Sequence, residues 1–176
     1  MKKTAIGIIL MFVLGASLYL FYLLGGFNEI LVFKKDYGNI ELVGIQYKGT
    51  PQNDLLRQSF LEMERLQKSH EGAVIHTIYQ VEPAGKLDTL EVFIGIEKKF
   101  LFTAEKDKAI LSLDASSAVV AEINANRWVM PGPKKVKTRI KDFAIKNQLP
   151  EPNLFIDQIL GPESIRVIGI YQLDEE

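Results

Sequence analysis

The most constraining feature of this 176-residue sequence is an order of elements that occurs twice after an apolar N-terminal segment. Strands are predicted where short β-branched or alternating apolar runs lie between turn residues, and helices where apolar residues recur every three or four positions. In each half, two strands precede an amphipathic helix and two strands follow it. The elements are expected at 30–34, 40–47, 54–70, 73–81 and 89–97, then at 109–113, 117–123, 134–147, 154–160 and 164–173. The repeat predicts an α+β fold in which two pseudo-symmetric halves share one sheet.

The closing strands of the two halves also agree in sequence. Phe93-Ile94-Gly95-Ile96 resembles Val167-Ile168-Gly169-Ile170. The alternative explanation is that apolar strands look alike without being equivalent. Breaks before the helices fit the repeat as well, with Thr50 expected as the first cap and Pro51 at the first helical position, and with Pro131-Gly132-Pro133 before the second helix.

The N-terminal segment predicts a membrane anchor over residues 1–27, followed by one soluble domain over residues 28–176. Residues 4–27 carry no charge, and about 20 helical residues cross a hydrocarbon core of about 30 Å. Lys2 and Lys3 precede the apolar run, which favours a cytoplasmic N-terminus and an extracytoplasmic domain. The alternative is a cleaved signal peptide, but the apolar run continues past Ala16 through bulky residues.

Charge and composition exclude several classes of function. Without Lys2 and Lys3, the 21 basic residues fall to 19 against 22 acidic ones, so the domain has a net charge of −3. This balance gives no reason to expect nucleic-acid binding. Because there is no cysteine, disulfides, thiolate metal sites and cysteine nucleophiles are excluded. The only histidines, His70 and His76, have no metal-ligand spacing, and no cofactor fingerprint is present, so no metal or cofactor is expected.

Glu91 is the first candidate for chemistry. Strand alternation places it on one face with Phe93 and Glu97. In a groove, the carboxylate would bind a cation or act as a general base; facing water, it would be a solvated strand residue. Aromatic residues with an apolar body are candidates to line a groove, although aromatic residues in strands are more often part of the core. The candidate ligand-binding residues are Tyr47, Tyr79, Glu91, Phe93, Trp128 and Tyr171.

A basic run opens the second predicted helix at residues 133–139. Lysines at a helix start oppose the helix dipole, so this run is suited either to an anionic ligand or lipid headgroup, or to a plain solvated helix face.

The segment 30–51, ILVFKKDYGNIELVGIQYKGTP, resembles the start of GyrI-like (SOUL/GyrI) small-molecule-binding domains. The likeness lies in the order of strand, turn, strand and Gly-Thr-Pro before a long helix, and it extends over most of the soluble part. It implies two helices on one face of the sheet and a ligand groove on the other. Many members place a glutamate before the final apolar run, facing the cleft, whereas this chain has Ser164-Ile165-Arg166. That departure puts a cationic-drug pocket or a glutamate-dependent hydrolase in doubt.

The function expected from these features is a membrane-anchored domain that holds an amphipathic or apolar small molecule in a groove between the two halves. Its partners would be that ligand and the bilayer, contacted through residues 4–27. The alternatives are a hydrolase that uses Glu91, and a protein-interaction module tethered to the membrane.

Overall fold

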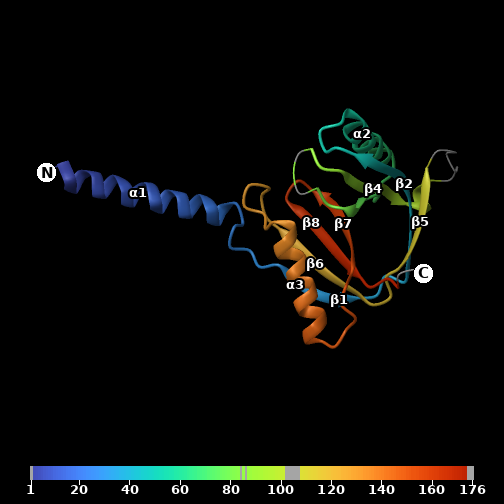
Figure 1. The fold of residues 1–176 in the computed structure, drawn as a ribbon. Coiled ribbons are helices and arrows are strands. Elements are labelled where there is room, and N and C mark those ends of the chain that lie inside the picture. The colour runs from blue at the N-terminus through green and yellow to red at the C-terminus, as the bar shows by residue number, and fades with distance from the viewer. Residues whose placement is uncertain (1, 84, 86, 102–107, 174–176) are drawn as a thin grey trace.

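The computed structural model describes residues 2–83, 85, 87–101 and 108–173, with side chains described from Ile6 onward (Figure 1). The long N-terminal helix stands apart from a curled sheet that carries the other two α-helices. The helices are α1 (Lys2–Leu23), α2 (Asp54–Ser69) and α3 (Pro133–Lys146), with a 3-10 turn η1 (Lys98–Phe100). The strands are β1 (Leu31–Lys35), β2 (Asn39–Gly49), β3 (Ile75–Val81), β4 (Leu90–Glu97), β5 (Ala109–Asp114), β6 (Ala118–Asn124), β7 (Leu154–Gly161) and β8 (Ser164–Ile170).

The eight strands form one antiparallel sheet in the order β1-β6-β8-β7-β3-β4-β2-β5. If β1 to β4 are exchanged with β5 to β8, the same order is read backwards. The sheet therefore has a pseudo-two-fold axis between β3 and β7, and each half places its first strand at the edge of the other half. The predicted α+β fold with two halves sharing one antiparallel sheet is confirmed.

The matching tetrapeptides of the closing strands are not structurally equivalent. Phe93 packs in the core of the helix-free face, whereas Val167, its partner in the sequence match, packs in the cluster that contains α3 residues. Successive strand residues point to opposite faces, so a shift of one position reverses every side chain. The repeat of elements is real, and the tetrapeptide likeness reflects the common composition of buried strands.

The outer face of the sheet is covered by α2 and α3, as Figure 1 shows. Met63 of α2 packs on one half and Ile140 of α3 on the other, and both are fully buried. Gly169 permits the second contact, because a Cβ there would lie 2.7 Å from the Ile140 side chain. Both helices therefore lie on one face, as the resemblance implied.

The inner face of the curl is filled at its centre by a second core. Its fully buried side chains come from both halves, and the largest is Phe93. The two edges of the sheet meet at their turns, where the Tyr37 N–H donates to the Ala115 carbonyl and the Ala115 N–H donates to the Gly38 carbonyl, at 3.1 and 2.8 Å. These bonds close one rim of the curl over the inner core.

The helix starts agree with the sequence in one half only. Gly132 precedes α3 and Pro133 opens it, as expected. The expectation for α2 was wrong, because Asn53 is the cap: its side chain accepts from the Leu55 N–H at 2.9 Å. The carbonyl of Thr50 instead accepts from the Asn53 N–H and from the Tyr47 hydroxyl, so residues 50–53 form a turn before the helix.

Helix α1 is long and apolar enough to cross a membrane. Its window Ile6–Leu23 has a mean hydropathy of 2.3, and none of it is buried against the domain. The helix is joined closely to the domain, because the Leu24 carbonyl accepts from the Asn126 N–H at 2.9 Å. The side chain of Asn28 adds a bond to the Asn124 carbonyl. The segment after α1 is thus fixed to the loop between β6 and α3.

We expect Phe93→Ala to destabilise the domain by about 3–5 kcal/mol, because truncating a fully buried aromatic leaves a cavity. Thermal unfolding in detergent would show a fall in Tm of about 8–15 °C. The matched control is Leu87→Ala, since this side chain is 81% exposed. An equal Tm for the two variants would contradict the assignment of Phe93 to the inner core.

Candidate functional site

A row of four polar residues runs across the inner face on neighbouring strands. Glu122 of β6 lies opposite Arg166 of β8, Arg166 lies opposite Gln158 of β7, and Gln158 lies opposite His76 of β3. His76 and Gln158 are buried, while Glu122 and Arg166 are partly exposed at the outer end of the row. The row crosses the pseudo-two-fold axis, so it joins the two halves.

Hydrogen bonds link this row into one chain. His76 Nδ1 donates to the Val74 carbonyl at 2.9 Å, because a carbonyl only accepts. His76 Nε2 is then the acceptor for the Gln158 amide nitrogen at 2.7 Å. The Gln158 amide oxygen accepts from Arg166 Nη1 at 3.3 Å. Arg166 completes the chain on Glu122, with Nε and Nη2 at 2.9 and 2.7 Å from one carboxylate oxygen.

Burial decides the protonation of His76. Removal from water lowers the pKa of its imidazole, and the bond to the Val74 carbonyl and the charge of Glu97 oppose that shift only in part. The neutral ring with hydrogen on Nδ1 is the form that the chain requires. Protonation at Nε2 would place a second donor against the Gln158 amide, which would have to turn and then point its own N–H groups at Arg166.

A cavity of about 340 Å³ opens beside this row at one end of the inner face. Its wall is formed by His76, Gln158 and Arg166, and Ile40 gives it an apolar patch. The rim carries ion pairs between neighbouring elements. They join Lys98 to Glu41 at 3.3 Å and Lys99 to Glu97. The cavity is therefore amphipathic, with residues from both halves in its wall.

Tyr37 contributes the one buried side-chain polar atom in the described part of the chain that has no hydrogen-bond partner. Its ring packs against the inner core, its hydroxyl is buried, and the residue is part of the lining of the same cavity. Leaving a buried hydroxyl unsatisfied costs about 1–3 kcal/mol. Such a group calls for a partner that the described residues do not supply, such as an ordered water or a bound molecule.

The second half has a hollow in the equivalent place. This larger cavity, of about 750 Å³, is lined from β5, the start of β7 and the segment after β8. The last two correspond to the start of β3 and the segment after β4, which line the first cavity. Tyr171 and Leu173 lie in its wall. The ends of the inner face are thus hollow in both halves, whereas its centre is filled.

None of the six predicted site residues lines the first cavity, and three of them lie off the inner face. Tyr47 and Tyr79 pack with α2 on the outer face, and the Tyr47 hydroxyl donates to the Thr50 carbonyl at 2.8 Å. Burial raises the pKa of Tyr79, with Asp157 and Glu82 acting in the same direction. Trp128 is 78% exposed in the loop after β6, where Arg127 stacks on its ring at 5.0 Å.

The other three lie on the inner face or at its end. Glu91 pairs with Lys48 at 2.9 Å, Phe93 fills the core, and Tyr171 lines the second cavity. The structure therefore does not bring the six candidates into one cavity. Their assignment to ligand binding stays a prediction.

The residues of the polar row were not proposed from the sequence. A signal was present, because each interrupts an apolar strand: His76 in IHTI, Glu122 in AVVAEI, Gln158 in IDQI and Arg166 in SIRVI. Strand alternation assigns each of these residues to one face of its own strand. Only the order of the strands in the sheet shows that the four residues adjoin one another. Tyr37 lies in the turn between the strands expected at 30–34 and 40–47, and no local pattern in the sequence indicated that its ring folds onto the inner core.

One carboxylate with a strongly shifted pKa lies outside this site. Burial raises the pKa of Asp157 to about 6, with Lys137 opposing and Glu82 reinforcing the shift. Asp157 is on the outer face, beside a mostly apolar cavity of about 250 Å³ at the start of α3.

The hydrogen-bond chain predicts one tautomer of His76. In a His70→Asn background His76 is the only histidine, so its imidazole ¹⁵N signals are unambiguous. We expect hydrogen on Nδ1 and none on Nε2 at pH 7, because burial holds the pKa of this imidazole below the usual 6.5. Hydrogen on Nε2 of the neutral ring at pH 7 would contradict the direction of the chain.

Comparison with known proteins finds neighbours of the fold. The crystal structure of a hydrolase from Listeria innocua matches with a TM-score of 0.55 and 8% identity, over 78% of this chain and 89% of that chain. The C-terminal domain of EcmrR matches with a TM-score of 0.53 and 10% identity, over 82% of this chain and 99% of that chain. EcmrR in its complex with DNA matches with a TM-score of 0.54 and 10% identity, over 96% of this chain and 68% of that chain.

No protein-family model matches the sequence, and no curated protein matches it. At identities of 8–10% these structural likenesses show the fold alone. This chain therefore shares its fold with these proteins, and its resemblance to GyrI-like domains stays an expectation from the sequence.

Proposed function

We propose that this chain is a membrane-tethered binding protein that holds a small amphipathic molecule against the inner face of its sheet. The observation that carries the proposal is the enclosed Tyr37 hydroxyl beside a cavity whose polar wall comes from both halves. A cavity of about 340 Å³ is in the range of small-molecule sites. An apolar part of the ligand would lie on Ile40, and an acceptor or donor group would meet Tyr37.

The chemistry of the wall narrows the class of ligand. Arg166 belongs to the segment Ser164-Ile165-Arg166, where the resemblance to GyrI-like domains would lead us to expect a glutamate, and Glu122 holds its guanidinium in place. The Arg166 side chain lies in the cavity wall together with neutral His76 and Gln158. This wall favours a neutral or anionic polar group on the ligand over the cations that a lone carboxylate would select.

The central part of the inner face argues against one continuous groove. Phe93 and its neighbours fill that region, so a ligand would be held at an end of the face rather than along its whole length. A wholly filled face would have favoured a protein-interaction module. The hollow ends with a polar wall support binding of a small molecule instead.

The tether in this proposal is α1. Its length, its mean hydropathy and its lack of contact with the domain core support insertion in a bilayer. Lys2 and Lys3 would keep the N-terminus in the cytoplasm and place the domain on the other side.

A hydrolase that uses Glu91 has less support. One neighbour of the fold is described as a hydrolase, which concerns that protein. In this chain, Lys48 is the partner found for Glu91 among the described side chains, on the part of β4 that pairs with the end of β2. No histidine or hydroxyl is hydrogen-bonded to Glu91 within the described residues, so a general base acting on a nucleophile is not assembled there.

Tyr37→Phe tests the proposal through opposite effects on stability and binding. Removing a hydroxyl with no partner should raise the stability of the ligand-free protein by about 1 kcal/mol, or about 2–4 °C in Tm. The same change should abolish or greatly reduce the Tm increase produced by an amphipathic ligand found in a panel screened on the wild type.

Tyr47→Phe is the matched control. It removes a hydroxyl that donates to the Thr50 carbonyl on the outer face, so it should lower Tm and leave the ligand response intact. If no member of a broad panel raises the wild-type Tm, or if Tyr37→Phe keeps the full response, the binding proposal fails.

A further inference from the structure

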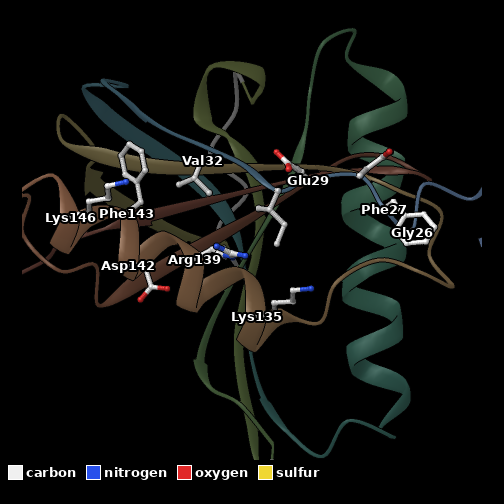
Figure 2. Close-up of a pocket in the computed structure, with 11 residues that line it drawn as sticks. Gly26, Phe27, Glu29, Val32, Lys135, Arg139, Asp142, Phe143 and Lys146 are labelled. Atoms are coloured by element: carbon white, nitrogen blue, oxygen red, sulfur yellow. The ribbon is translucent and has the colours of Figure 1, made fainter. Parts of the chain in front are cut away.

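A separate cavity on the outer face lies between α3 and the segment that leaves α1, and Figure 2 shows its lining. It measures about 630 Å³, and its walls are residues 26–30, Val32 and one side of α3. It is distinct from the inner-face cavity, because it lies on the outer face of the sheet. The chain from α1 enters it directly, so it lies at the end of the domain nearest to the proposed membrane span (Figure 1).

The side of α3 that lines this cavity is basic. Lys135 and Arg139 are one helical turn apart, and both project into the space beside residues 26–30. Their side chains have no hydrogen-bond or ion-pair partner among the residues that the structure describes. Elsewhere on the same helix, Lys137 pairs with Glu82 and Lys141 pairs with Glu151. Four cations of α3 have no ion-pair partner among the described residues, and three of them, Lys135, Arg139 and Lys146, line the cavity, whereas Lys134 does not.

Charge over the whole domain shows the same asymmetry. Helix α3 holds six of the 19 basic residues of the domain and one of its 22 acidic residues, a net charge of +5. The remainder has 13 basic and 21 acidic residues, a net charge of −8. Glu29 and Asp142 also line the cavity, and neither forms an ion pair with Lys135 or Arg139. A bilayer with anionic lipids would therefore attract this end of the domain and repel the rest.

The adjacent loop carries a side chain suited to the membrane interface. Trp128 is 78% exposed and stacks with Arg127. The same loop binds the end of α1 through the bond from Asn126 to Leu24. Tryptophan is enriched at the level of lipid headgroups. An exposed Trp in the loop that binds the end of an apolar helix fits contact with headgroups.

From these features we infer that the cavity between α3 and residues 26–30 binds the phosphate of an anionic phospholipid from the bilayer that α1 enters. Lys135 and Arg139 hold the phosphate, and Trp128 lies in the headgroup layer beside it. The inference rests on the tether in the proposed function, and it is independent of the ligand on the inner face. It assigns the basic start of α3 to lipid rather than to solvent.

The test uses the full chain in nanodiscs and its only tryptophan, Trp128, as the reporter. Phosphatidylcholine discs contain an equal small fraction of either brominated phosphatidylglycerol or brominated phosphatidylcholine. We expect the brominated anionic lipid to quench Trp128 about twofold more strongly. In Lys135→Gln/Arg139→Gln the ratio should fall to about one. The control Arg65→Gln/Lys68→Gln removes two exposed cations from α2 and should keep the wild-type ratio.

Three results would overturn the inference. The first is equal quenching by the two lipids in the wild type, and the second is an unchanged ratio in the Lys135/Arg139 variant. The third is loss of the ratio in inorganic phosphate but not in sodium chloride of equal ionic strength, which would assign the cavity to free phosphate. Failure of the chain to elute with the discs would overturn the tether as well, so the two failures are distinguishable.

Discussion

The polar row from Glu122 to His76 is the feature on which the rest of the inner face depends. Its central pair, Gln158 with His76, lies in the pairing of β7 with β3 that joins the two halves. Buried polar groups weaken a fold unless each is satisfied, so the register of these strands has to place four side chains opposite one another. On the next strand, His76 lies opposite Gly95, where the ring of Phe93 takes the space that a Cβ would need. The polar row therefore ends at His76, and the ring of Phe93 occupies the next place on the inner face.

Each half places its first strand at the edge of the other half, and this exchange positions the residues that enclose the polar row. Because β1 pairs with β6 and β5 with β2, the turns after β1 and β5 can meet at the rim and fold Tyr37 over the inner core. Neither half could build this enclosure alone, since the first half supplies Tyr37 and His76 and the second half supplies Gln158 and Arg166. The hollow ends of the inner face follow from that geometry rather than from a groove along the sheet.

Much of the fold could be predicted from the sequence, and much of the site could not. Period and turn residues located all ten elements of the domain that the sequence indicated, because alternation and helical spacing are local. The start of α2 was misplaced because the Thr50 carbonyl, through its bond to the Tyr47 hydroxyl, is part of a turn that only the folded strand forms. The site depends on which strands are neighbours, and no local pattern states that β8 lies between β6 and β7. Trp128 was a candidate for the lining of a groove, and in the folded chain it lies in an exposed loop that binds the end of α1.

The central claim is that the enclosed Tyr37 hydroxyl marks a site for a small molecule. The most direct measurement is native mass spectrometry of the full chain released from the membrane in which it is produced, with wild type and Tyr37→Phe treated alike. The account predicts a bound mass of small-molecule size on the wild type that is absent or much reduced on the variant, while both proteins are folded. Equal bound mass on the two proteins, or none on either, would contradict it.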